Sequence, residues 1–122
     1  MGKETKILIV DDDAHSRTTL TDLLTENEFK VITAADGKEA LDKVNKKKPH
    51  VVLMDIRLPG LNGYELCRAI KKVEGSTTKI ILYTAYVDAV NVSKAKEAGA
   101  DDFLGKTSGF SNLLIAVNNL LQ

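Results

Sequence analysis

Three uninterrupted runs of four apolar residues constrain the fold of this 122-residue chain more than any other feature. They occupy residues 7–10, 51–54 and 80–83, and two shorter runs stand at residues 31–32 and 103–104. Continuous runs rich in β-branched and large aliphatic residues are typical of strands buried on both faces, as in a parallel sheet covered by helices. The two shorter runs predict shorter strands nearer the edges of that sheet.

The segments between these runs have the spacing of amphipathic helices. The last segment is the clearest, because Phe110, Leu113, Leu114 and Val117 recur at intervals of three and four residues. Residues 87–98 are the weakest, since they offer mainly Val90 and alanines. Strand and helix thus alternate five times. This pattern predicts an α/β fold, a (βα)5 doubly wound five-stranded parallel sheet with helices on both faces, in a single domain spanning residues 1–122.

Polar side chains stand where the predicted strands end. Asp11 and Asp12 follow the first strand and Asp55 follows the third. Thr84 ends the fourth strand, and Lys106 follows the fifth. The functional crevice of a doubly wound sheet lies beyond the carboxyl ends of its strands, so we expect these side chains to converge there. Three carboxylates without clustered histidine or cysteine suit a hard cation, and Mg²⁺, with Mn²⁺ as the alternative, is the expected metal.

Each of these residues alone has an ordinary structural explanation. An aspartate after a strand is often a helix N-cap, and Asp13, directly before the first helical segment, is expected to be one. The placement of charged and hydroxyl groups at the ends of different strands is what favours a phosphoryl-binding site. His15 and His50 are interpreted as surface and loop residues, and Cys67 as part of the core.

Composition limits the remaining classes of function. The chain has 17 basic and 17 acidic residues, and this zero net charge argues against bulk electrostatic binding of nucleic acid or of a membrane surface. A single cysteine excludes an internal disulfide. The sequence shows neither an apolar run near the length of a membrane span nor an N-terminal signal segment. The expectation is a soluble cytoplasmic protein.

Four motifs together resemble the receiver domain of two-component response regulators, in particular chemotaxis-regulator-like receivers, over essentially the whole chain. They are residues 7–12 (ILIVDD), 53–63 (LMDIRLPGLNG), 84–85 (TA) and 98–106 (AGADDFLGK). The resemblance implies a flavodoxin-like strand order of 2-1-3-4-5. It also implies that Asp55 is the phosphoacceptor of a phosphorelay. Asp11, Asp12 and Asp55 would hold the magnesium, together with the backbone carbonyl of Arg57.

The same resemblance implies how such a domain works. A sensor histidine kinase, a phosphotransfer protein or a small acyl phosphate would donate the phosphoryl group to Asp55, and Thr84 and Lys106 would contact its oxygens. Thr84 and Phe103 would then switch the face made by the fourth helix, the fifth strand and the fifth helix. That face would bind a downstream effector domain or protein and would offer a dimer interface. The domain would catalyse only its own phosphorylation and dephosphorylation.

Two residues are expected to affect the lifetime of the phosphoryl group. Arg57, two residues after Asp55, and Tyr86, two residues after Thr84, would tune that lifetime, and a bulky Tyr86 predicts slow dephosphorylation. The residue after Lys106 concerns the position of that lysine. Family members usually carry a cis Lys-Pro pair, whereas Thr107 follows Lys106 here. A cis bond before a residue other than proline costs about 3 kcal/mol, so a trans or strained bond is expected at this point.

Three other functions fit these residues less well. A phosphohydrolase with an aspartate nucleophile would carry a second acid two residues after Asp55, where Arg57 stands. A flavodoxin-type flavin protein would need a Ser/Thr/Gly-rich loop after the first strand, whereas the three aspartates there would repel a phosphate. A degenerate receiver that only binds partners would lack the acceptor or the acid pair. A phosphorylatable receiver domain is therefore the predicted function.

Overall fold

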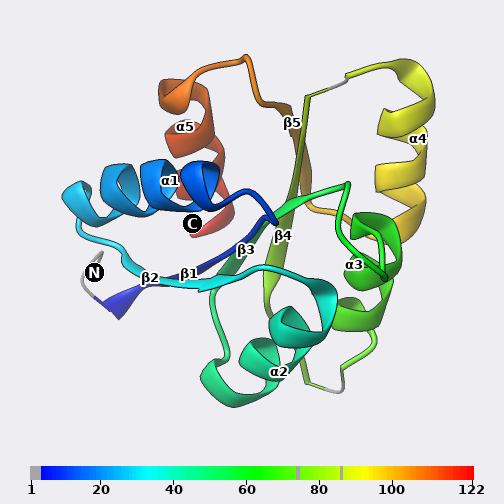
Figure 1. Ribbon diagram of the computed structural model, residues 1–122, viewed down its shortest axis with the longest axis horizontal. Coiled ribbons are helices and arrows are strands. Elements are labelled where there is room, and N and C mark those ends of the chain that lie inside the picture. The colour runs from blue at the N-terminus through cyan, green and yellow to red at the C-terminus, as the bar shows by residue number, and fades with distance from the viewer. Residues whose placement is uncertain (1–3, 74, 86) are drawn as a thin grey trace.

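Strands and helices alternate along the chain in the computed structural model, which describes residues 4–73, 75–85 and 87–122 (Figure 1). The elements of the described residues are β1 (Lys6–Val10), α1 (Ala14–Glu26), β2 (Lys30–Ala34), α2 (Gly37–Lys47), β3 (Val51–Asp55), α3 (Gly63–Lys71), β4 (Lys79–Thr84), α4 (Ala89–Ala98), β5 (Asp102–Gly105) and α5 (Phe110–Leu120). The strands pair in parallel in the order β2-β1-β3-β4-β5. The predicted (βα)5 fold and its strand order are therefore confirmed.

Two apolar layers lie on opposite faces of the sheet. Successive strand residues point to opposite faces, so Ile7 and Ile9 of β1 pack towards α1 and α5, while Leu8 and Val10 pack towards α2, α3 and α4. Figure 1 shows the two helical layers on either side of the sheet. The apolar run of β1 is buried throughout, as expected for a strand covered on both sides. β2 and β5 lie at the edges as predicted, but only β5, with four residues, is shorter than the five-residue β1.

Polar side chains determine where four of the helices begin. Asp13, Asp36, Asn62 and Asp88 each accept a hydrogen bond from the backbone N–H three residues further on. The predicted N-cap role of Asp13 is confirmed, and its hydrogen bonds from the Ser16 hydroxyl and N–H hold the pKa of the Asp13 carboxyl below its usual value. These caps place the first turns of α1 and α3 beside the ends of the strands that carry the acidic residues.

Helix α4 forms where the helical pattern of the sequence is weakest. It buries only Ala95 and Ala98, and the side chain of Val90 is 62% exposed. Gly99 ends the helix with φ 91°, a left-handed conformation that glycine adopts without steric cost. Helix α4 is therefore held by few apolar contacts.

Candidate functional site

The carboxyl ends of the strands border a cavity of about 350 Å³ that is lined by Asp12, Asp55, Arg57, Thr84, Ala85 and Lys106. Asp11, at the end of β1, lies beside this cavity and is 2% exposed. The structure thus brings together the acids, the threonine and the lysine that the sequence placed at different strand ends. The physical reason is the parallel sheet, whose strands all end at the same edge.

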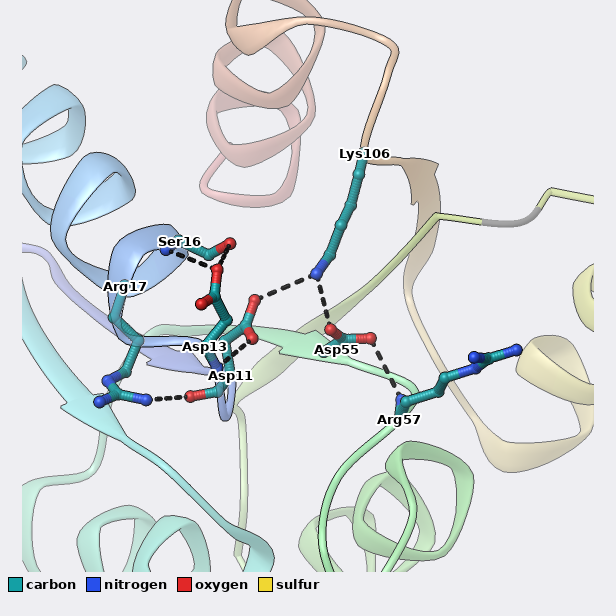
Figure 2. Close-up of polar contacts among 7 residues, drawn as sticks. All are labelled: Asp11, Asp13, Ser16, Arg17, Asp55, Arg57 and Lys106. Atoms are coloured by element: carbon teal, nitrogen blue, oxygen red, sulfur yellow. Dashed lines mark hydrogen bonds and ion pairs between the residues drawn. The ribbon is translucent and has the colours of Figure 1, made fainter.

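Three carboxylates of this site face one another. Asp11, Asp12 and Asp55 each offer one oxygen, and these oxygens lie within 4.8 Å of one another. The Asp13 N–H donates to Asp11 Oδ1 over 2.9 Å and the Arg57 N–H donates to Asp55 Oδ1 over 3.1 Å, which fixes the orientation of the two buried carboxylates (Figure 2). Carboxylate oxygens can accept more than one bond, so this all-oxygen set fits a hard divalent cation.

Lys106 connects two of these acids. Its Nζ donates to Asp55 Oδ2 over 2.7 Å and to Asp11 Oδ2 over 3.2 Å (Figure 2). Burial by itself would lower the pKa of Lys106. The hydrogen bonds to Asp55 and Asp11 and the negative charges of both carboxylates have a larger effect in the opposite direction, so the pKa of Lys106 lies above its usual value. Lys106 is therefore an ammonium at this site, and it reaches the acids although Thr107 replaces the usual proline.

Burial is the main cause that raises the pKa of Asp11 above its usual value. The Asp13 N–H and the Lys106 ammonium oppose this shift, and the negative charge of Asp55 adds to it. For Asp11, desolvation therefore matters more than repulsion by the neighbouring carboxylate of Asp55.

Two residues that the sequence analysis did not single out shape the acidic loops. The Arg17 guanidinium on α1 donates to the Asp11 carbonyl over 2.6 Å. The Gly63 N–H donates to the Ile56 carbonyl over 2.7 Å, and a Cβ at Gly63 would lie only 2.6 Å from the Asp55 carbonyl oxygen. Gly63 stands inside the motif that carried the family resemblance, so a signal was present there. Nothing in the sequence pointed to Arg17.

The predicted switch and lifetime residues have different surroundings. Thr84 is 5% exposed and pairs with Gly105 of β5. Phe103 pairs with Leu82 and packs, partly buried, against the apolar layer of α3 and α4. The Arg57 side chain is exposed and points away from the acids (Figure 2). Tyr86 lies outside the described residues, and the switching and lifetime roles stay predictions.

The two histidines and the cysteine lie where the sequence indicated. His15 is exposed on α1, and His50 precedes β3, where its Nδ1 accepts a hydrogen bond from the Lys6 N–H. Cys67 is buried on α3, and this burial raises the pKa of its thiol to about 11. These positions confirm the surface, loop and core interpretations.

Comparison with known proteins adds independent evidence. The sequence model of the response regulator receiver domain matches residues 7–118. The chain belongs to this family. Among relatives of the receiver domain, the DNA-binding response regulator MtrA of Mycolicibacterium paratuberculosis is 40% identical over 101 residues, which are 83% of this chain and 44% of MtrA. This chain thus spans less than half the length of that relative.

Solved receiver structures have the same fold. The chemotaxis protein CheY4 of Vibrio cholerae has a TM-score of 0.89 at 29% identity, covering 95% of this chain and 98% of that chain. The BeF3-activated N-terminal receiver domain of RstA from Klebsiella pneumoniae has a TM-score of 0.89 at 31% identity, covering 97% of this chain and 99% of that chain. The resemblance to receivers that the motifs indicated is confirmed. Within the described residues of this receiver domain, no helix has both the length and the apolar character of a membrane span.

Proposed function

We propose that Asp55 is the phosphoacceptor of this receiver domain. The observation that supports it is the Asp55 carboxylate at the wall of the cavity, with the Lys106 ammonium 2.7 Å from its Oδ2 and two further acids beside it. The donor would be the phosphohistidine of a sensor histidine kinase or phosphotransfer protein, or a small acyl phosphate. Such a kinase donor would place the domain in the cytoplasm.

The transfer forms one bond and breaks another. An Asp55 carboxylate oxygen attacks phosphorus and forms a P–O bond, while the P–N bond to the donor imidazole breaks. The electron pair goes to the imidazole nitrogen, which takes a proton from solvent; an acyl phosphate instead releases its carboxylate. The domain supplies position and charge for this step, and its catalysis is limited to its own phosphorylation and dephosphorylation.

The remaining site residues would balance the charge. Asp11, Asp12 and Asp55 would hold Mg²⁺, or Mn²⁺ in its place, together with the backbone carbonyl of Arg57. When bound, the metal would neutralise negative charge on the phosphoryl oxygens. The Lys106 ammonium and the Thr84 hydroxyl, from the ends of two other strands, would each contact a phosphoryl oxygen.

Phosphate incorporation tests the assignment of Asp55. Acetyl phosphate labelled at phosphorus and Mg²⁺ are added to the protein, and the label bound to the chain is measured. Asp55→Asn should abolish incorporation, because an amide oxygen is a poor nucleophile. The matched control is Asp22→Asn, which alters an exposed acid on α1 and should leave incorporation unchanged. Undiminished labelling of Asp55→Asn would refute the assignment.

Thermal unfolding tests the metal site without any phosphorylation. A ligand that binds only the folded state stabilises it by about 2.7 kcal/mol at a concentration one hundred times its Kd. We therefore expect Mg²⁺ to raise the Tm of the wild-type domain and of Asp22→Asn, and to raise the Tm of Asp12→Asn by much less. An equal rise in all three proteins would contradict a metal held by the acids of the cavity.

For the output, we infer that the face formed by α4, β5 and α5 changes shape on phosphorylation through Thr84 and Phe103. The sparse packing of α4 supports this, since a loosely held helix is easily shifted. A downstream effector domain or protein, or a second copy of the domain, would bind to this face. Arg57 and Tyr86 would tune the lifetime of the phosphoryl group on Asp55.

Chemical shifts of the backbone amides test the change at this face. On adding beryllofluoride, the amide signals of α4, β5 and α5 should move. Shifts confined to the acidic cavity would contradict a change of shape at this face.

A further inference from the structure

Tyr83 stands next to the proposed phosphoacceptor in the sheet. It is the penultimate residue of β4, and it pairs in register with Asp55 of β3 and Leu104 of β5. Residues in register on neighbouring strands point to the same face of a sheet, so the Tyr83 ring and the Asp55 carboxylate share the face covered by α1 and α5. The ring is half-buried and packs against the apolar layer on that face.

The Lys106 ammonium lies over this ring. Its Nζ is 5.8 Å from the ring centre, within the range in which the face of an aromatic ring attracts a cation. The same Nζ donates to the carboxylates of Asp55 and Asp11. Three groups therefore surround one ammonium: Asp55 on β3, Tyr83 on β4 and Asp11 just after β1. Of these three, the ring attracts the ammonium without accepting a hydrogen bond.

The backbone of Lys106 is anchored separately. Its N–H donates to the Thr84 carbonyl over 2.7 Å, and both the N–H and the hydroxyl of Ser108 donate to the Gly105 carbonyl. No peptide bond of the described residues is cis, so the bond to Thr107 is trans. These contacts fix the Cα of Lys106, but a four-carbon side chain keeps considerable rotational freedom of its own.

We propose that Tyr83 is a positioning residue for Lys106. The Tyr83 ring keeps the Lys106 ammonium at the cavity while the N–H donors of that ammonium pass from the carboxylates to the phosphoryl group. This inference rests on the proposed function of Asp55. The two carboxylate bonds of Lys106 compete with a phosphoryl group for the same donors, whereas attraction to a ring face does not. The ring is thus the contact that can persist through the transfer.

The role requires the aromatic ring and does not require the hydroxyl group. Tyr83→Phe keeps the ring face and should behave as the wild type. Tyr83→Leu keeps an apolar side chain and removes the ring, so it separates positioning from packing. A contact of this kind changes an equilibrium or a rate by about 2- to 30-fold, so the phosphorylation rate of Tyr83→Leu with acetyl phosphate at saturating Mg²⁺ should fall within that range.

Ring-current shifts test the geometry without any phosphorylation. The ε-methylene protons of Lys106 should resonate upfield of ordinary lysine values in the wild type and in Tyr83→Phe, and at ordinary values in Tyr83→Leu. Upfield shifts together with a slowed Tyr83→Leu support the proposal. An ordinary shift in the wild type, an unchanged rate in Tyr83→Leu, or a Tyr83→Phe as slow as Tyr83→Leu would overturn it.

The two proposals fail in different ways. Undiminished labelling of Asp55→Asn refutes the phosphoacceptor and leaves the ring-current result standing, whereas an ordinary Lys106 shift refutes the role of Tyr83 and leaves labelling of Asp55 unaffected. If Tyr83→Leu does not fold, Tyr83→Met provides a long apolar side chain without a ring, and the same criteria apply to it. A thermal unfolding curve of each variant establishes that it is folded under the assay conditions.

Discussion

Gly63 determines how closely α3 approaches the strand that carries Asp55. The first turn of α3 folds back on the end of β3, and its Gly63 N–H donates to the Ile56 carbonyl. A Cβ at this position would lie 2.6 Å from the Asp55 carbonyl oxygen and 2.7 Å from the Ile56 Cα. Backbone atoms cannot rotate away as a side chain can, so any larger residue forces the strand end and the helix apart.

Replacing Gly63 with alanine should therefore be costly. We expect Gly63→Ala to lower the free energy of unfolding by about 1–3 kcal/mol, the usual cost of forcing an added carbon into a well-packed site, despite the higher helix propensity of alanine. Urea unfolding followed by circular dichroism measures this change. Gly37→Ala is the matched control, because Gly37 also begins a helix and the atom nearest to its added Cβ would be the Leu61 Cβ, at 3.1 Å. Equal losses in the two variants would contradict the explanation.

Among the elements, α4 differs from its neighbour α3 in how it is held. Helix α3 buries an apolar face that includes Leu66, Cys67 and Ile70, whereas α4 buries only two alanines. The Tyr64 hydroxyl of α3 lies 3.0 Å from Asn91 Oδ1 in the first turn of α4. This polar contact supplements the small apolar area that α4 buries.

Native-state hydrogen exchange should detect this difference. We expect the backbone amides of α4 to exchange faster than those of α3, because local opening costs less where few apolar contacts are lost. Tyr64→Phe removes the hydroxyl and should speed exchange further in α4 while leaving α5 unchanged. Exchange followed by mass spectrometry measures each helix separately. Equal protection of α3 and α4 in the wild type would show that the sparse packing of α4 has no energetic consequence.

For the molecule as a whole, the single thiol couples stability to pH. Cys67 is buried in the apolar layer that α3 shares with the sheet, and burial raises the pKa of its thiol to about 11 from an ordinary value of 9.0. Between these values the unfolded chain loses the thiol proton while the folded chain keeps it. The free energy of unfolding therefore falls as pH rises through this window. Below the window the thiol is protonated in both states and adds no pH dependence to that free energy.

A thiol-free variant isolates this contribution. Cys67→Ala should lose less stability than the wild type between pH 8 and pH 10.5, by an amount that approaches about 2 kcal/mol. Urea unfolding of both proteins at the two pH values, with a reductant present, measures the difference. Lysine and tyrosine titrations are common to the two proteins and cancel. Parallel losses of stability would mean that the buried thiol ionises as readily in the folded state as in the unfolded state.

The sequence by itself determined the fold and the outline of the site. Continuous apolar runs of four residues, rich in β-branched and large aliphatic side chains, favour strands covered on both sides, so their alternation with helical segments predicted a parallel sheet. Parallel strands end at one edge and the two shorter runs predicted the outer strands, so Asp11, Asp12 and Asp55 were expected to converge near the middle of that edge. The family resemblance added the strand order, which the apolar pattern leaves open.

The tertiary structure alone decided which side chains touch. Three contacts show this: the position of Tyr83 beneath Lys106, the bond from Arg17 to the Asp11 carbonyl and the close approach of Gly63 to Asp55. Each joins a residue of a helix or strand to one at the end of another strand or in the loop that follows it. Such contacts depend on strand register and on the rotamers that packing selects, and neither is encoded in a local pattern of residue types. The pKa of Asp11 also depends on tertiary packing. Burial raises this pKa more than repulsion by Asp55 does, and the extent of burial is set by all the groups that pack around the carboxylate.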